Sequence, residues 1–237
     1  PRVDLVRIIT KASHVMKFRL ILAVLGLLLI AFTAACGPEP QIRSDDLLRD
    51  NSFLTGDPCG PPCWRNIIPG QTNWQNALTI IEDDPTLDRL QTRADEESSA
   101  IAAGWAQVDG EGCCQMFTED GSTVSFVVLQ TRPDHTLGEV IAEHGEPAYV
   151  IGEAITGDQG LFNLFYPDTP MIIYVFIAGE QGELSPTSEV VGFAYMTETL
   201  MDELLTTYSL HAWEGYLSLN AYQQIDFAIT AVPEESD

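Results

Sequence analysis

The chain has 237 residues with 35 acidic and 11 basic side chains, which give a formal net charge of −24 at pH 7. Residues 36–237 hold six arginines, no lysine and 34 of the acidic residues, so this part alone carries a net charge of −28. That charge all but excludes nucleic acid as a partner, because the two surfaces repel. A hydrophobic content of 45 % excludes a disordered acidic tail.

A secretory signal is predicted at residues 16–35. A short basic segment, Met16 to Arg19, precedes an apolar run from Leu20 to Ile30, and small residues then lead to Cys36. A charged region, an apolar region and a small-residue cleavage site are the parts of such a signal. The run is shorter than the roughly 20 residues that a membrane-spanning helix needs. Residues 1–15 lie upstream of Met16 and are expected not to belong to the natural protein.

Residues 16–36 resemble the precursor of a bacterial lipoprotein. In that family a peptidase cuts before the cysteine, whose thiol carries a diacylglycerol. The resemblance implies that Cys36 is lipidated, with acyl chains such as palmitate, and that the mature domain is held on the outer face of the cell membrane. Thr33 departs from the family, in which leucine is commoner at this place. The alternatives are an ordinary signal peptide cut between Ala35 and Cys36 and an uncleaved N-terminal anchor.

Four cysteines follow Cys36, namely Cys59, Cys63, Cys113 and Cys114. An even number in an exported chain predicts disulfides. Because adjacent cysteines bridge only with a strained peptide, we expect two bridges between the loop at residues 59–63 and the strand at 113–114. Each would close a loop of roughly 50 residues and stabilise the fold by about 4 kcal/mol. A four-thiolate zinc site is the alternative, but its second half has no spacer, and no metal is assigned.

Residues 36–56 are polar and predict a tether, and residues 57–131 predict a first folded unit. This unit begins with a rigid loop rich in proline and glycine that ends at Trp64. Thr72 and Gln75 form a capping-box pattern, which predicts the start of a helix with Trp74 and Ile81 on its apolar face. A second short helix is expected at 87–96. Asp-Gly turns then separate three expected strands at 101–108, 113–118 and 123–130.

Residues 132–237 predict a second unit with the same order of elements. Thr136 and Glu139 form another capping box, and Gly145 to Pro147 ends the helix that follows. Strands are expected at 149–153, 160–166, 171–177 and 190–196, followed by a helix at 199–206 and an aromatic C-terminal segment. The predicted fold class is therefore α+β, with two similar units that each place helices before an antiparallel meander.

Two short motifs carry further resemblances. The stretch from Pro62 to Thr72 is similar to lipoproteins of Chloroflexi-like bacteria. The helix start at Pro69 to Thr72 and the helix end at Gly145 to Pro147 resemble the small α/β lipoprotein domains of the outer-membrane assembly and β-lactamase-inhibitor-protein type. The two motifs fall in different units of this chain. The resemblance implies a binding or scaffold role rather than catalysis.

The sequence contains no G-x-S-x-G nucleophile motif and no phosphate-binding glycine loop. We therefore assign no catalytic residue and no cofactor, and we predict a non-catalytic module that binds a protein or another envelope ligand. Trp64, Trp105 and Trp213 are the candidate binding residues, because tryptophan is enriched in binding hot spots. The alternatives are an extracytoplasmic hydrolase with two carboxylates less than about 10 Å apart and a cation-binding surface protein with converging carboxylates.

Overall fold

The computed structural model describes residues 42–179 and 181–230. The predicted signal segment, Cys36 and the residues after 230 lie outside the described residues, so their predictions are not addressed by the structure. No helix within the described ranges combines the length and the hydropathy that a membrane crossing requires.

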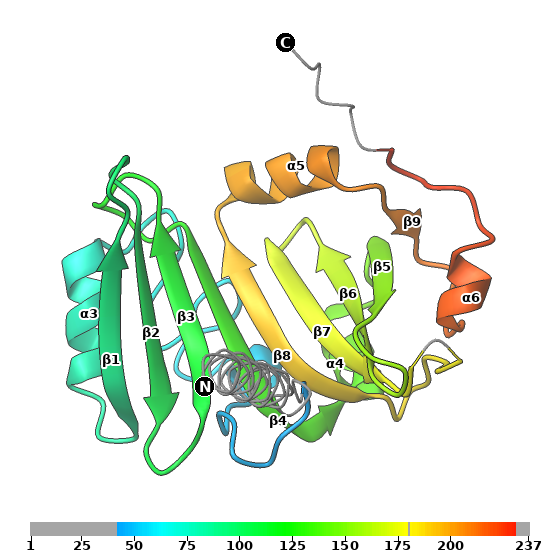
Figure 1. Ribbon diagram of the computed structural model, residues 1–237, viewed down its shortest axis with the longest axis horizontal. Coiled ribbons are helices and arrows are strands. Elements are labelled where there is room, and N and C mark those ends of the chain that lie inside the picture. The colour runs from blue at the N-terminus through cyan, green and yellow to red at the C-terminus, as the bar shows by residue number, and fades with distance from the viewer. Residues whose placement is uncertain (1–41, 180, 231–237) are drawn as a thin grey trace, which may run out of the picture. The chain divides into compact units, whose positions relative to one another are not determined.

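A single antiparallel sheet organises the described residues (Figure 1). Its nine strands follow the order β1-β2-β3-β4-β8-β7-β6-β5-β9. Strands β1 to β4 form one meander and β5 to β8 form another, and the two meanders meet where β4 pairs with β8. The strands are β1 (Leu87–Ala94), β2 (Ile101–Gln107), β3 (Gly112–Thr118), β4 (Phe126–Thr136), β5 (Tyr149–Ala154), β6 (Gly160–Tyr166), β7 (Met171–Ile177), β8 (Glu189–Met196) and β9 (His211–Ala212).

The predicted division into two α+β units is wrong, because the two meanders form one continuous sheet. The expected boundary after Thr131 falls inside β4, which pairs with β3 along one edge and with β8 along the other. Val127 faces Tyr195 and Leu129 faces Phe193 across the β4–β8 pair, and all four side chains are buried. A meander that ended at β4 would leave its outer backbone groups unpaired, and β8 satisfies them.

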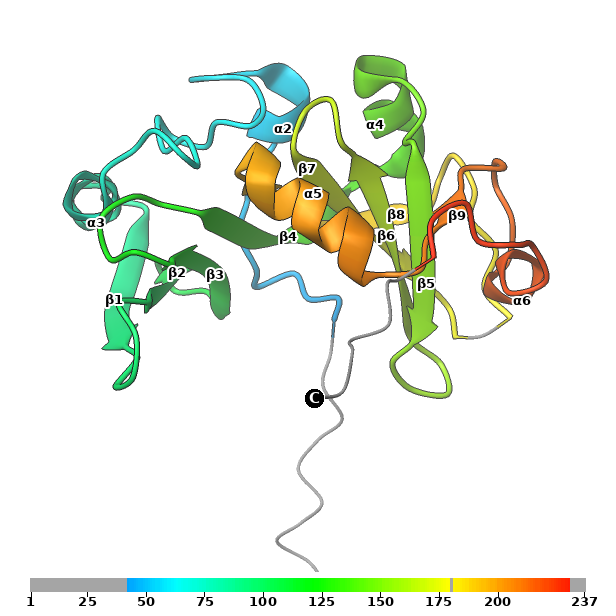
Figure 2. The ribbon, with the colours of Figure 1, turned by 90° about the horizontal axis from the view of Figure 1, so that it is seen from above.

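Among the described residues, five short helices accompany the sheet: α2 (Ser52–Thr55), α3 (Trp74–Glu82), α4 (Leu137–His144), α5 (Glu198–Thr207) and α6 (Leu219–Tyr222). We call the sheet face with Trp105, Leu129 and Phe193 the back face, because these residues share one core with α3 and α4. The opposite, front face carries Phe165 and Ile172, which pack with Met201 of α5. Figure 2 shows α4 and α5 on opposite sides of the sheet.

Local patterns predicted most elements, with two main differences. Residues 87–94 form the edge strand β1 instead of a helix, because their backbone pairs with β2. The cap of α3 is Asn73, whose side chain accepts a hydrogen bond from the Gln75 amide, and not Thr72. The capping box of Thr136 and Glu139 at α4 is confirmed, with both of its hydrogen bonds present.

The described part of the expected tether packs against the domain. Leu48 and Phe53 are fully buried in the back-face core. The Leu48 amide donates to the carbonyl oxygen of Gln130, and the Arg132 amide donates to that of Leu48, so the segment runs along β4 as a short parallel bridge. Residues 42–56 thus belong to the folded domain, because Leu47, Leu48 and Phe53 bury their apolar surface in its core.

Candidate functional site

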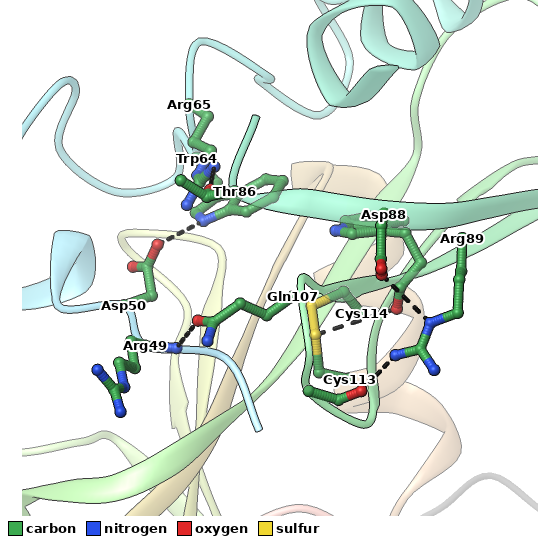
Figure 3. The surroundings of a disulfide bond; sticks show 12 residues. Arg49, Asp50, Trp64, Arg65, Thr86, Asp88, Arg89, Gln107, Cys113 and Cys114 are labelled. Atoms are coloured by element: carbon green, nitrogen blue, oxygen red, sulfur yellow. Dashed lines mark hydrogen bonds and ion pairs between the residues drawn. A yellow bond between two sulfur atoms is a disulfide. The ribbon is translucent and has the colours of Figure 1, made fainter. Parts of the chain in front are cut away.

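The four cysteines after Cys36 form two disulfides, but the expected pairing between distant segments is wrong. Cys59 bonds to Cys63 and Cys113 bonds to Cys114, so each bridge closes within its own segment. Figure 3 shows the Cys113–Cys114 bridge. The second bridge joins neighbouring residues of β3, and both of its cysteines are buried. Because the two cysteines of each pair are close in sequence, each bond can form without contact between the loop at residues 59–63 and the sheet.

Two of the three candidate tryptophans lie together in the core near these cysteines. Trp64 is 0 % exposed and Trp105 is 3 % exposed, and their rings stack with centroids 5.7 Å apart. The indole N–H of Trp64 donates to Asp50 at 2.9 Å (Figure 3), and the same carboxylate accepts from Ser52. Side chains so deeply buried stabilise the domain and do not reach a partner at its surface.

Trp213 lies apart from that pair, near the C-terminal end of the described chain. It contacts Tyr216 edge to face, with ring centroids 5.7 Å apart, and it packs near Tyr222 of α6. Its side chain is partly buried, and its indole N–H has no acceptor among the described residues. The structure therefore does not bring the three tryptophans together in one surface.

An apolar hollow lies instead on the front face, between the sheet and α5. This cavity, which we call the front pocket, has a volume of about 400 Å³. That is within the usual range for small-molecule sites, which are concave and mostly apolar with a few placed polar groups. Its apolar wall comes from four strands and from α5, and consists of Phe126, Ile151, Phe165, Ile172, Tyr174, Leu204 and Tyr208.

Strand alternation places these side chains in the pocket. In β7, Ile173 and Val175 point into the back-face core, so Ile172 and Tyr174 point to the front. In β6, Phe162 and Leu164 likewise face the back, which leaves Asn163 and Phe165 on the front. Helix α5 begins at a capped end, where the Thr197 side chain accepts from the Leu200 amide. Its last turn then brings Leu204 and Tyr208 over the sheet.

The polar groups of the front pocket are few, and they come from Glu153, Asn163, Tyr174 and Tyr208. Asn163 Oδ1 is buried and has no hydrogen-bond partner within the described part of the chain. Glu153 of β5 contributes the carboxylate that lines the pocket. Burial raises the pKa of Tyr174 to about 12, so its hydroxyl stays protonated at neutral pH. The lining includes no arginine, lysine or histidine.

A second hollow of about 500 Å³ lies over β1, β2 and β3, and Arg89 and Arg93 line it. Arg89 is already engaged within the protein, since its Nε lies 3.2 Å from Asp88 Oδ1 and its Nη2 donates to the Gly110 carbonyl (Figure 3). Its floor is formed by small residues such as Ala102 and Gly104. Trp105 and Cys114 also line this second hollow, but Trp105 is its one aromatic residue and the others are polar, charged or small. We therefore take the front pocket, with its several aromatic rings, as the candidate site.

Within residues 42–179 and 181–230, no group of three or more histidine, cysteine, aspartate or glutamate side chains is placed to hold an ion. The bonded cysteines also lack free thiolates for zinc.

Sequence reasoning missed every residue of the front pocket. One signal was present, because Asn163 is the only polar side chain within the apolar strand Gly160–Tyr166. A polar residue in such a strand indicates either a buried hydrogen bond or a site. The aromatic residues of the pocket wall gave no separate signal, because the sequence pattern of a strand is the same whether its apolar residues fill a core or line a cavity.

Comparisons with protein-family models, with curated proteins and with solved structures gave no significant match. The site therefore has to be interpreted from its own geometry, as an apolar pocket with acceptor groups on one face of an antiparallel sheet.

Proposed function

We propose that this protein is a lipid-anchored, non-catalytic binding module that holds a small organic ligand in the front pocket, outside the cell. The observation that carries the binding role is the pocket itself, a cavity of about 400 Å³ with aromatic and aliphatic walls. The exported, anchored location rests on the signal-like pattern of residues 16–36 in the sequence.

The chemistry of the pocket favours binding over hydrolysis. A hydrolase that uses acidic residues needs a pair of carboxylates about the scissile bond. The front pocket is lined by the single carboxylate of Glu153, together with Asn163 and tyrosine hydroxyls. An apolar wall with isolated polar groups fixes the orientation of a ligand without supplying an acid–base pair.

Methyl NMR of the full chain in lipid nanodiscs tests the binding role. Ile151 and Ile172 line the pocket, whereas Ile81 of α3 is buried in the back-face core and serves as an internal control. With labelled isoleucine methyl groups and benzyl alcohol as the probe, we expect saturable shifts at the two pocket residues and none at Ile81. Equal, non-saturating shifts at all three residues would contradict the proposal.

A pocket-filling variant makes this test specific. Leu204→Trp places a large ring in the pocket from α5, while Thr206→Trp adds the same ring at an exposed position of the same helix. We expect the first variant to abolish the probe-dependent shifts and the second to keep them. If both variants bind the probe like the unmodified protein, the ligand site lies elsewhere.

The anchoring part of the proposal has its own test. Mass spectrometry of the protein from its native membranes is expected to show a mature N-terminus at Cys36 that carries acyl groups. An unmodified N-terminus at another residue would contradict lipid anchoring and would leave the pocket experiment unaffected.

A further inference from the structure

We infer that the ligand of the front pocket is an organic cation, a protonated amine attached to an apolar group. This inference rests on the proposed binding role and specifies the chemistry of that same site. Three features of the pocket favour a positive charge: its aromatic walls, its unpartnered acceptor, and the combination of an acidic residue with a helix C-terminus in its lining.

The aromatic walls are the first feature. Phe126, Phe165, Tyr174 and Tyr208 contribute four rings to a cavity of about 400 Å³. The face of an aromatic ring carries partial negative charge, and it attracts ammonium groups with an energy that increases as water is removed. The same rings can also pack against the apolar group of an amine, so the cavity can hold both the ammonium group and the apolar group of the ligand.

The unpartnered amide of Asn163 is the second feature. Its Oδ1 is buried and accepts no hydrogen bond from the described residues. A buried polar atom without a partner is unfavourable, and a ligand that brings a donor relieves that cost. An ammonium group offers up to three N–H donors and no acceptor, whereas a carboxylate or phosphate ligand would offer only acceptors to this atom.

The electrostatic surroundings are the third feature. Glu153 places a carboxylate in the lining. The C-terminal end of α5 lies at the pocket through Leu204 and Tyr208, and its last turn contains no basic residue. The C-terminal end of a helix carries partial negative charge and favours a cation. None of the six arginines of residues 36–237 lines the pocket, so no internal cation competes for this position.

Matched probes test the inference on the full chain in nanodiscs of zwitterionic lipid. The probes are 2-phenylethylamine, which is protonated at neutral pH, the neutral 2-phenylethanol and the anionic 3-phenylpropionate. The readout is the methyl shift of Ile151 and Ile172, with Ile81 as the control. We expect the amine to bind about tenfold more tightly than the alcohol, and the carboxylate to bind most weakly.

Two variants and a matched control separate the contributions. Glu153→Gln is expected to weaken amine binding roughly two- to fivefold and to leave alcohol binding unchanged, as for an exposed ion pair. Glu143→Gln removes the same charge from an exposed position on α4, across the sheet, and is expected to change neither. Asn163→Leu removes the acceptor at similar volume and is expected to weaken both the amine and the alcohol.

The outcomes distinguish this inference from the proposed function. If the alcohol or the carboxylate binds as tightly as the amine, the pocket binds ligands but the cation assignment is overturned. If no probe gives a saturable shift at Ile151 and Ile172, the proposed function itself fails. If Glu153→Gln and Glu143→Gln weaken amine binding equally, the preference comes from the net charge of the protein and the assignment to this pocket is overturned.

Discussion

The indole rings of Trp64 and Trp105 stack in the back-face core with their centroids 5.7 Å apart and their planes inclined by 27°. Trp64 belongs to the loop that follows the Cys59–Cys63 bridge, and Trp105 belongs to β2. The Arg65 guanidinium lies 5.0 Å from the centroid of the Trp64 ring. The stacked pair therefore fixes the proline-rich loop onto the sheet.

Substitution of Trp64 is predicted to destabilise the domain. Trp64→Ala removes a fully buried ring and leaves the Asp50 carboxylate without its indole donor, so we expect a loss of about 3 to 5 kcal/mol in the free energy of unfolding. Trp64→Phe keeps an aromatic ring and should lose less. Urea denaturation followed by circular dichroism measures both. A loss below about 1 kcal/mol for Trp64→Ala would contradict a structural role.

The two disulfides are predicted to contribute little to global stability. The Cys59–Cys63 bridge spans a sequence separation of 4 and the Cys113–Cys114 bridge a separation of 1. Since short loops restrict the unfolded chain least, reduction should lower the free energy of unfolding by about 2 kcal/mol or less for each bridge. Denaturation with and without reductant measures this effect. Peptide mapping under non-reducing conditions is expected to find no cross-link between residues 59–63 and residues 113–114.

Gly192 of β8 is predicted to be intolerant of even a methyl group. A Cβ atom at this position would lie 2.5 Å from the carbonyl oxygen of Leu129, in the backbone of the neighbouring β4. Because that contact would force apart the two strands that join the meanders, Gly192→Ala should destabilise the domain by about 1 to 3 kcal/mol.

A matched control for this prediction is Gly112→Ala in β3, where an added Cβ meets no atom within 4 Å. Thermal unfolding of both variants measures the difference. Equal midpoint temperatures for the two variants would show that β4 and β8 accommodate the added methyl group without loss of stability.

Stability is predicted to fall in alkali because of Tyr174. Burial raises its pKa in the folded state to about 12, above the ordinary tyrosine value of 10.0. Below pH 10 both states keep the proton, and between these two pKa values only the unfolded state releases it. Stability is therefore lost as the pH rises from about 10 to 12, by roughly 2 to 3 kcal/mol from this residue.

The Tyr174→Phe variant should show a shallower decline over the same pH range, because it has no phenol to ionise. Urea denaturation at stepped pH values measures the slope for both proteins. Identical slopes would mean that the Tyr174 hydroxyl titrates in the folded protein as it does in the unfolded chain.

The strands of the second meander show how well the local sequence predicts secondary structure. The strands expected at 160–166 and 171–177 coincide with β6 and β7, and the helix expected at 199–206 corresponds to α5. These segments are long and rich in apolar residues, and they are bounded by turn residues, so they give consistent local signals. Residues 87–94 lacked such a signal, because Leu87 and Leu90 fit a helical spacing and the strand depends on β2 for its hydrogen bonds.

Local sequence patterns were enough to locate most strands and helices, and composition alone set the strong negative charge of the domain, because these properties depend on neighbouring residues or on residue counts. The folded structure was needed to show that β4 pairs with β8, that Trp64 and Trp105 are buried, and that Asn163 lines a pocket. Strand pairing and cavities depend on contacts between residues far apart in the chain. The alternation of apolar and polar residues shows that the two faces of a strand differ in polarity. It does not show which face is fully packed and which face lines a cavity.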